Sequence, residues 1–299
     1  MKPTKRDSMT ETHPDRFLLY IDILGFSEMT KSDPRSVART YAILNKLNVH
    51  RDNSFRTIVF SDTVLVYNLI EARIDDERNF YVWYLTEAAE DLYSRLVGQD
   101  IWFRAVLIAG EFNHYQLENM DCFYGTALID AYQSEKRLPM MGLAIHSSCI
   151  PYNRFFRVAP FTDDFSFVYL SRPLEHLHTS SGDTYPFLGS IVSVFSPSLP
   201  EGVRYLADIH NLMRTHPDPL VRAKALTTWD FYARRYPGMV AALVASAFSL
   251  DALAPARTWE DEQRALDESI KHYKRAGAGS QMSVSITQQR RRKPGHAIS

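Results

Sequence analysis

The stretch FLLYIDILGF, residues 17–26, decides the fold, because it is an apolar run broken by a single aspartate. Bulky aliphatic and aromatic residues in such a run predict a buried β-strand, here from about Arg16 to Ile23. A lone carboxylate inside a buried strand costs several kcal/mol unless it is paired or binds a metal ion. Asp22 therefore predicts a ligand or a charged partner near the end of this strand.

The segments that follow predict both helices and strands. Gly25 predicts a turn into a helical stretch, and Pro34 precedes a second helix. The run RTIVFSDTVLVY, residues 56–67, contains two β-rich halves joined by Ser61 and Asp62, which predicts a hairpin with Asp62 at its tip. Helices are expected at 79–97 and after Gly125, and further strands at 102–112, 141–148, 165–171 and 187–195.

The chain changes character after Pro197. Residues 198–275 predict three or four helices, with prolines near their boundaries at Pro217, Pro219, Pro237 and Pro255. Strands interleaved with helices, followed by helices alone, predict an α+β fold in which helices pack on a mostly antiparallel sheet.

Composition excludes several classes of protein. A formal net charge of −1 gives no overall basic footprint for a nucleic-acid polymer. Cys122 and Cys149 lack metal-type spacing, so neither a disulfide framework nor a zinc site is expected. The polar N-terminus has no apolar core of a signal peptide, and the apolar tract 239–254 is too short to span a bilayer. We therefore expect a cytoplasmic protein that does not enter a membrane.

Two aspartates are the candidates for chemistry. If the first strand and the hairpin are neighbours in the sheet, Asp22 and Asp62 converge, and a nearby backbone carbonyl completes a ligand set of oxygen atoms. Such a set suits magnesium or manganese, which also accept substrate phosphates as ligands. The alternative is that Asp62 serves as a turn former and Asp22 as a satisfied polar residue.

Four motifs resemble, in order and spacing, the core of class III nucleotidyl cyclases. They are IDILGF (21–26), FSDTVLVY (60–67), FRAVLIAGEF (103–112) and YGTALIDAYQSEK (124–136). That family has a metal aspartate on the first strand, a second in a strand hairpin, a strand ending in Gly-Glu and a helix opened by Gly. The resemblance covers roughly residues 17–195 and implies an α+β fold with a ferredoxin-like core, to which a C-terminal helical extension is added.

The departures from that family concern the purine-reading residues. The base-reading position falls on Ile58, its partner on Cys122, and the transition-state Asn and Arg on Ile129 and Gln133. The DILGF start, the FSDT hairpin and the GTAL…AY…E helix are more similar to the pyrimidine cyclases of Pycsar anti-phage defence. This resemblance implies conversion of UTP to cyclic UMP, with CTP to cyclic CMP as the alternative. A cyclase fold without activity, which binds nucleotides or a partner, is the other alternative.

The resemblance also implies the parts of the site. Asp22, Asp62 and the Ile23 carbonyl would hold two Mg²⁺ or Mn²⁺ ions, and the ribose 3′-hydroxyl would attack the α-phosphate. Class III sites lie between two chains, which implies a head-to-tail homodimer with composite sites and a separate effector that reads the cyclic product. The predicted substrate-binding residues are Leu24, Gly25, Phe26, Ile58, Arg104, Cys122, Tyr132 and Lys136.

Several of these residues have a second interpretation. The backbone N–H groups of residues 24–26 lie where a helix begins, which is a natural place for phosphate. Arg104 lies within an apolar strand and needs a partner, so it either binds substrate or forms a structural ion pair. Tyr132 either borders the base or packs in the core.

The predicted organisation has four parts. We expect a flexible N-terminus at 1–15, a cyclase-like catalytic domain at 16–196, a helical extension at 197–275 and a disordered basic tail at 276–299.

Overall fold

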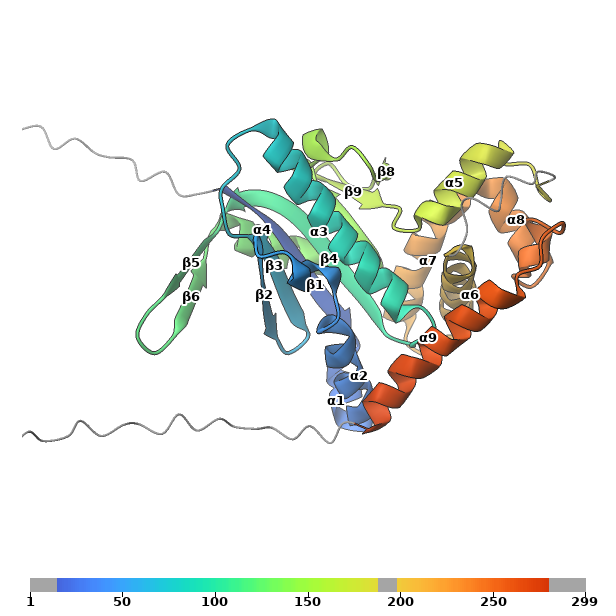
Figure 1. Cartoon of the computed structure of the whole chain (residues 1–299), viewed down its shortest axis with the longest axis horizontal. Coiled ribbons are helices and arrows are strands. Elements are labelled where there is room, and N and C mark those ends of the chain that lie inside the picture. The colour runs from blue at the N-terminus through green and yellow to red at the C-terminus, as the bar shows by residue number, and fades with distance from the viewer. Residues whose placement is uncertain (1–14, 188–197, 280–299) are drawn as a thin grey trace, which may run out of the picture.

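The computed structural model describes residues 15–187 and 198–279. In this part of the chain, the main sheet has the strand order β2-β3-β1-β4-β7-β9-β8 (Figure 1). β4 and β7 run parallel, and the other neighbouring pairs are antiparallel. Its strands are β1 (Asp15–Leu24), β2 (Phe55–Phe60), β3 (Thr63–Asn68), β4 (Trp102–Glu111), β7 (Gly142–His146), β8 (Val158–Pro160) and β9 (Phe165–Val168).

The first four strands form a ferredoxin-like core. Helices α1 (Phe26–Ser32) and α2 (Pro34–Leu44) connect β1 to the β2–β3 hairpin, and α3 (Asp75–Leu96) connects β3 to β4. With the spatial order β2-β3-β1-β4, this is the β-α-β-β-α-β arrangement of ferredoxin-like folds. The predicted α+β fold is therefore confirmed, as are the first strand and the hairpin at residues 61–62.

Two helices cover opposite faces of the sheet because side chains alternate along β1. Phe17 contacts Tyr81 of α3, with ring centroids 6.0 Å apart. Tyr20 points to the other face, where it meets Tyr132 of α4 (Thr126–Arg137) at 6.5 Å. Asp22 shares the face of Tyr20, so it lies on the side of the sheet that α4 covers.

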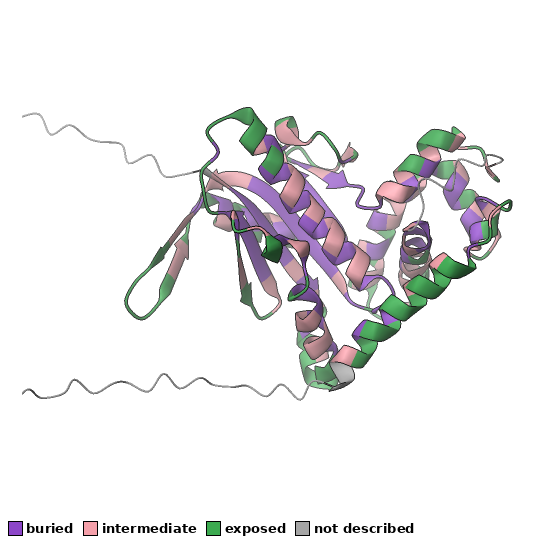
Figure 2. Ribbon diagram, viewed as in Figure 1, coloured by how far each residue is buried: buried purple, intermediate pink, exposed green. Residues whose placement is uncertain are grey.

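The helical extension packs beside the core (Figure 1). It consists of α6 (Leu199–Thr215), α7 (Pro219–Arg235), α8 (Pro237–Ala245) and α9 (Glu260–Gly279), and α5 (Arg172–Ser181) leads into it. α6 packs against α7, and α9 returns to lie along α2. Figure 2 shows buried residues running from the sheet into the extension, whereas most of α9 is exposed. None of the described helices is both long enough and apolar enough to cross a membrane.

Some expectations need correction or lie outside the described residues. Residues 113–116 form β5 (Asn113–Gln116), which pairs with β6 (Asp121–Tyr124) in a second sheet that the sequence did not predict. α9 runs to Gly279, past residue 275, where the helical extension was expected to end. The predicted strand at 187–195 has only Phe187 in the described part, and that residue is not in a strand. Residues 1–14 and 280–299, including most of both predicted disordered ends, also lie outside it.

Candidate active site

The register of β1 against β3 brings the two aspartates close. Asp22 stands opposite Thr63, so the preceding residue, Asp62, lies beside it at the hairpin turn. The Ile23 N–H donates to the Asp62 carbonyl oxygen at 2.9 Å and ties the turn to the end of β1. The two carboxylates thus belong to neighbouring ends of adjacent strands.

Helix α2 holds the hairpin turn in place. Ser61 has a φ of 57°, the left-handed conformation that a two-residue hairpin turn requires. Tyr41 of α2 donates its hydroxyl to the Ser61 carbonyl at 3.1 Å. Burial raises the pKa of Tyr41, and the charge of Asp62 raises it further, so the Asp62 carboxylate lies on this side of the turn.

The two carboxylates repel each other. Burial raises the pKa of Asp22, and the negative charge of Asp62 adds to that rise. Arg104, Lys224 and Lys136 oppose it, with Arg104 the strongest of the three. The pKa of Asp22 still lies above its ordinary value, so the cations of the chain do not fully offset the cost of ionising this carboxylate. A divalent cation would supply the missing charge.

Arg104 is the buried cation of the site. It stands opposite Asp22 on β4, with 3.7 Å between its Nη2 and the Asp22 Oδ2. Its guanidinium is ion-paired with the buried Glu135 of α4 and donates to the Leu138 carbonyl oxygen at 2.9 Å. Burial lowers the pKa of Arg104, and the charge of Asp22 works against that change. The partner expected for this buried arginine is therefore present.

Tyr132 and Lys136 line the site from α4. Tyr132 is 48% exposed, so the interpretation of this side chain as core packing is wrong. The Lys136 Nζ lies 3.8 Å from the centre of the Tyr132 ring and donates to its hydroxyl. Tyr20, which the sequence did not single out, touches the Tyr132 ring and has its hydroxyl 3.5 Å from the Thr63 hydroxyl.

Residues 24–26 form the junction between β1 and α1. Gly25 has a φ of 73°, which a residue with a side chain rarely adopts, and its carbonyl accepts from the Met29 N–H. Phe26 buries its ring and contacts Tyr41 at 5.9 Å. Leu24 is half-buried. The junction is next to Asp22 in the chain, so a phosphate role for its backbone remains a prediction.

Ile58 and Cys122 are placed differently. Ile58 pairs with Leu65 on the edge strand β2 and shares the sheet face of Asp22. Cys122 lies in β6, beyond the end of β4 that is opposite to Arg104. At about 3.3 Å per residue, Arg104 and the last residue of β4, Glu111, are roughly 23 Å apart. A single chain therefore does not bring Cys122 to the aspartates.

The donor set fits a magnesium or manganese site of the open kind. Within the described residues, no cluster of three or more His, Cys, Asp or Glu side chains forms a closed metal site. Two carboxylates and the Ile23 carbonyl are oxygen ligands, and Mg²⁺ is commonly held by one or two carboxylates plus substrate phosphates. Asp22 and Asp62 are enough for that arrangement.

Lys224 is a residue near the site that no pattern in the sequence indicates. It lies on α7 in the helical extension and is half-buried. Its effect on the pKa of Asp22 exceeds that of Lys136. No local motif marks it, because the folding of the extension against the core brings it there.

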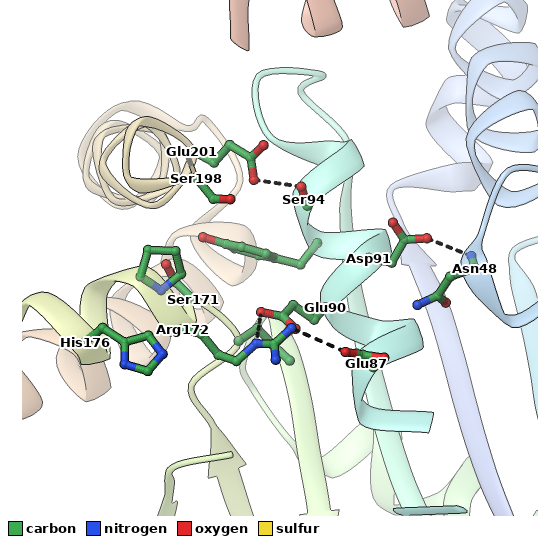
Figure 3. Close-up of a pocket in the computed structure, with 13 residues that line it drawn as sticks. Asn48, Glu87, Glu90, Asp91, Ser94, Ser171, Arg172, His176, Ser198 and Glu201 are labelled. Atoms are coloured by element: carbon green, nitrogen blue, oxygen red, sulfur yellow. Dashed lines mark hydrogen bonds and ion pairs between the residues drawn. The ribbon is translucent and has the colours of Figure 1, made fainter. Parts of the chain in front are cut away.

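A separate pocket of about 420 Å³ lies between α3 and the starts of α5 and α6 (Figure 3). Four acidic residues line it, and each has a partner in the chain: Arg172 contacts Glu87 and Glu90, Ser94 donates to Glu201, and Asp91 accepts from Asn48 and Arg95. None of the predicted site residues lines this pocket. Its polar contacts join the extension to α3, and we treat it as a structural junction.

His176 and His178 do not form a metal site. An extended EHLH segment would place both histidines on one side, but the segment is helical in α5, where residues two apart point in different directions. His178 instead lies 3.2 Å from the Asp183 Oδ1, and His176 lines the pocket of Figure 3.

No protein-family model matches the chain, and no curated protein matches its sequence. Similar solved structures include the monomeric guanylyl cyclase domain of the RhoGC fusion protein from the aquatic fungus Blastocladiella emersonii, at 14% identity and a TM-score of 0.43, over 52% of this chain and 95% of that one. The adenylyl cyclase CyaB from P. aeruginosa is similar at 13% identity and a TM-score of 0.39, over 54% and 96%.

A class III adenylyl cyclase-like ATP-binding protein from Pseudomonas aeruginosa is similar at 16% identity and a TM-score of 0.36, over 60% of this chain and 41% of that one. At these identities and scores the likeness concerns the path of the chain alone.

Proposed function

We propose that the protein is a nucleotidyl cyclase that converts UTP to 3′,5′-cyclic UMP and pyrophosphate. The observation that carries the proposal is the pair Asp22 and Asp62 at the ends of adjacent strands, beside the buried Arg104. Oxygen ligands next to a fixed guanidinium suit a reaction on a metal-bound triphosphate. CTP, converted to cyclic CMP, is the alternative substrate.

Asp22, Asp62 and the Ile23 carbonyl would hold the metal ions. When bound, Mg²⁺ or Mn²⁺ lowers the pKa of a ribose 3′-hydroxyl and neutralises phosphate charge. The 3′-oxygen then forms a bond to the α-phosphorus while the bond to the pyrophosphate oxygen breaks. The two strands fix the carboxylates, so the chain contributes a geometry that exists before the substrate arrives.

Arg104 would stabilise the negative charge on the phosphates. Glu135 and the Leu138 carbonyl hold its guanidinium, so little conformational freedom is lost when it meets an anion. A donor held in advance is worth more in a buried site than in water, because it needs no reorganisation during the reaction. Arg104 also balances Asp22 when no substrate is present.

The preference for a pyrimidine rests on the resemblance and on Ile58. At the position where purine cyclases carry a base-reading polar residue, Ile58 can neither donate nor accept a hydrogen bond. Its side chain is partly buried against the core, which leaves an apolar wall on this part of the face. Tyr132, half-exposed at the border of the site, would contact the base.

A head-to-tail homodimer would complete the sites. Cys122 is expected near the base, yet it lies at the end of the sheet opposite to the aspartates. Exposed apolar residues follow the same face from the hairpin tip across α4, with Phe60 79% exposed and Ile129 55% exposed. Such a patch favours association between protein surfaces. In a head-to-tail dimer, the end of each chain that carries Cys122 would lie against the end of the other chain that carries the aspartates, which gives two composite sites.

We place this activity in the cytoplasm of a bacterium, as the synthesis of a second messenger during phage infection. A separate effector that binds the cyclic nucleotide would read the signal, and the cyclase itself would need neither a nucleic-acid polymer nor a membrane. These assignments follow from the Pycsar resemblance stated for the motifs.

The test is incubation of the full chain with each of the four labelled nucleoside triphosphates and Mn²⁺. We expect a cyclic product from UTP, and a weaker product or none from CTP, ATP and GTP. A cyclic product from ATP or GTP alone would overturn the pyrimidine assignment. The absence of a cyclic product from all four, with a folded protein, would overturn the cyclase assignment and favour a fold that only binds nucleotides.

A further inference from the structure

Helix α7 of the extension is attached directly to the sheet next to the site. The Thr228 hydroxyl accepts from the Met141 N–H at 2.8 Å and lies 3.3 Å from the Met141 carbonyl oxygen. Thr228 is fully buried, and Gly142, the residue after Met141, stands opposite Arg104 in the β4–β7 pair. The contact therefore places this part of α7 beside the strand that carries Arg104.

Lys224 lies one helical turn before Thr228 on the same face of α7. Burial lowers the pKa of Lys224, the charge of Arg104 lowers it further, and the charge of Asp22 raises it. The charges of Arg104 at the start of β4 and of Asp22 at the end of β1 therefore both act on this side chain of α7. Among the described residues, no carboxylate lies within ion-pair distance of the Lys224 ammonium.

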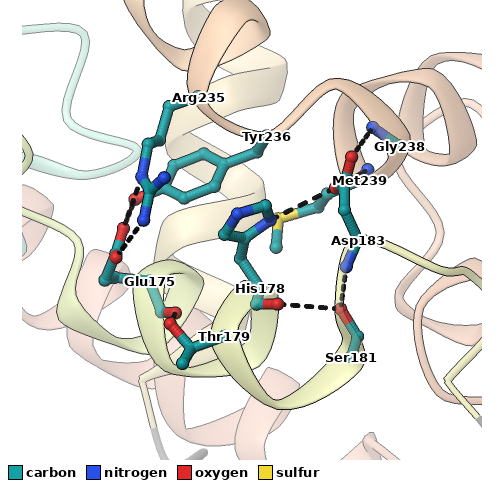
Figure 4. Close-up of polar contacts among 9 residues, drawn as sticks. All are labelled: Glu175, His178, Thr179, Ser181, Asp183, Arg235, Tyr236, Gly238 and Met239. Carbon is teal, nitrogen blue, oxygen red and sulfur yellow. Dashed lines mark hydrogen bonds and ion pairs between the residues drawn. The ribbon is translucent and has the colours of Figure 1, made fainter.

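Polar contacts fix the orientation of α7 at its other end (Figure 4). Arg235 and Tyr236 both donate to Glu175 of α5, at 3.0 and 2.9 Å. The Gly238 N–H donates to Asp183 at 2.8 Å, and a side chain at position 238 would come within 2.3 Å of the Asp183 carbonyl oxygen. α7 is thus held near its middle by Thr228 and at its C-terminal end by Arg235 and Tyr236.

The charges are arranged in order across neighbouring strands. Asp62 lies on the β3 side, Asp22 comes next on β1 and Arg104 on β4, while Lys224 lies on α7 one helical turn before Thr228, which is hydrogen-bonded to the residue that precedes β7. Neighbouring strands are about 4.8 Å apart, so the part of this row from β3 to β4 spans roughly 10 Å. Carboxylates at one end suit metal ions, and two cations at the other suit phosphate oxygens.

We propose that Lys224 of the helical extension binds the pyrophosphate portion of the nucleoside triphosphate, which makes the extension a part of the active site. This rests on the proposed function. A half-buried lysine beside a buried arginine repels that arginine, and an anionic ligand between the two cations removes the repulsion. The α-phosphate stays at the carboxylate end, where the 3′-oxygen attacks.

Binding of inorganic pyrophosphate, UTP and UMP to the full chain in Mg²⁺, measured by isothermal titration calorimetry, tests the proposal. Lys224→Gln removes the charge and keeps a polar side chain, which is shorter by one atom. We expect it to weaken binding of pyrophosphate and UTP by about 10-fold or more, because a charge-assisted hydrogen bond is lost. UMP, which lacks the pyrophosphate portion, should bind as it does to the unsubstituted chain.

Two further variants separate this role from a structural one. Lys224→Arg keeps the charge and should restore most of the affinity for pyrophosphate. Lys271→Ala, on the exposed surface of α9, is the matched control and should change nothing. The melting temperature of Lys224→Gln should be no lower than that of the unsubstituted chain, because the substitution removes a charge that burial and Arg104 disfavour.

The outcomes separate the two proposals. Unchanged pyrophosphate binding in Lys224→Gln would overturn this inference while cyclase activity of the unsubstituted chain stands. Equal weakening of UMP and pyrophosphate would overturn the assignment to the pyrophosphate portion. If pyrophosphate binding depends on Lys224 but no triphosphate yields a cyclic product, the phosphate role stands and the cyclase proposal fails.

Discussion

The two ends of the sheet face under α4 differ in what one chain can do alone. At one end, Asp22, Asp62 and Arg104 come from three adjacent strands and are held by hydrogen bonds and an ion pair. At the other end, the β5–β6 hairpin projects from the body and exposes apolar side chains such as Met120, which is 59% exposed (Figure 1). The first end is ordered for chemistry within one chain, whereas the second presents a surface for a partner.

The buried charged groups thus lie at the Asp22 end, and exposed apolar side chains lie at the β5–β6 end. The Tyr67 hydroxyl, 2.6 Å from the His114 Nδ1, anchors the base of the hairpin. Tyr124 at this base and Tyr115 beyond it are both about half-exposed. Apolar surface of this kind is costly in water unless something covers it. In the proposed dimer, the hairpin end of one chain would cover the charged end of the other.

Of the substitutions considered, removal of either aspartate at the charged end should lower turnover of UTP the most. Asp22→Asn and Asp62→Asn should each lower turnover of UTP by about 1,000-fold or more, since both carboxylates are proposed to hold the metal ions. Radiolabelled product analysis measures this, and Asp163→Asn, at an exposed position, is the control. If neither substitution alters turnover, the metal assignment fails.

Breaking the ion pair behind Arg104 should affect both stability and turnover. Glu135→Gln takes the nearer of two carboxylates from a buried guanidinium and leaves it the Leu138 carbonyl and the more distant Asp22, which should cost about 3 kcal/mol of unfolding free energy. Turnover should fall by about 100-fold, because Arg104 loses its fixed position. Urea unfolding and steady-state kinetics on the same variant check the two effects. Full stability with unchanged kinetics would contradict the role of Glu135.

The surface of the charged face should control association. Phe60→Ser should leave the melting temperature unchanged, because Phe60 is 79% exposed, but should weaken self-association by about 10-fold. Sedimentation velocity over a range of concentrations measures it. Phe155→Ser changes an equally large exposed ring that contacts Trp83 of α3, on the opposite side of the sheet, and serves as the matched control. Equal effects of the two substitutions would contradict the proposed interface.

Glu201, in the acidic pocket of Figure 3, should make the free energy of unfolding of the chain depend slightly on pH. Burial raises the pKa of Glu201, the Ser94 hydrogen bond lowers it, and the charge of Asp91 raises it. A raised carboxyl pKa favours the folded state at low pH, and that contribution is lost as pH rises from the ordinary value of 4.5 through the raised one.

Glu201→Gln should therefore gain stability relative to the unsubstituted chain as pH rises from 4 to 7.5, by at most about 1 kcal/mol. Urea unfolding at both pH values measures this, with Glu268→Gln on the exposed surface of α9 as control. A constant difference between the variant and the unsubstituted chain at the two pH values would refute the account of this pocket.

The sequence predicted the charged end better than the hairpin end. The apolar run around Asp22 and the two-residue turn at Ser61 and Asp62 are local patterns, and antiparallel pairing brings their ends together without further information. β5 was missed because its short run, residues 113–116, is polar and has no alternation of apolar side chains. For the same reason, the sequence did not predict the β5–β6 hairpin.

Two further features of the site could not be predicted, because they depend on contacts between segments that are distant in the sequence. Lys224 lies on the part of α7 that Thr228 joins to Met141, far away in the chain, and no periodicity encodes that contact. The expected partner of Arg104 follows from the cost of a buried charge, but its identity, Glu135, depends on how α4 packs on β4. Local sequence patterns therefore predict the helices and strands, whereas the positions of Glu135 and Lys224 depend on how distant elements pack together.

The central claim is that Asp22 and Asp62 together bind a divalent cation that acts on a nucleotide. Electron paramagnetic resonance of Mn²⁺, titrated into the full chain with a non-hydrolysable UTP analogue, tests it most directly. We predict that the unsubstituted chain binds Mn²⁺ in a nucleotide-dependent way and that Asp22→Asn and Asp62→Asn each abolish this binding. Equal Mn²⁺ binding by all three proteins would contradict the claim.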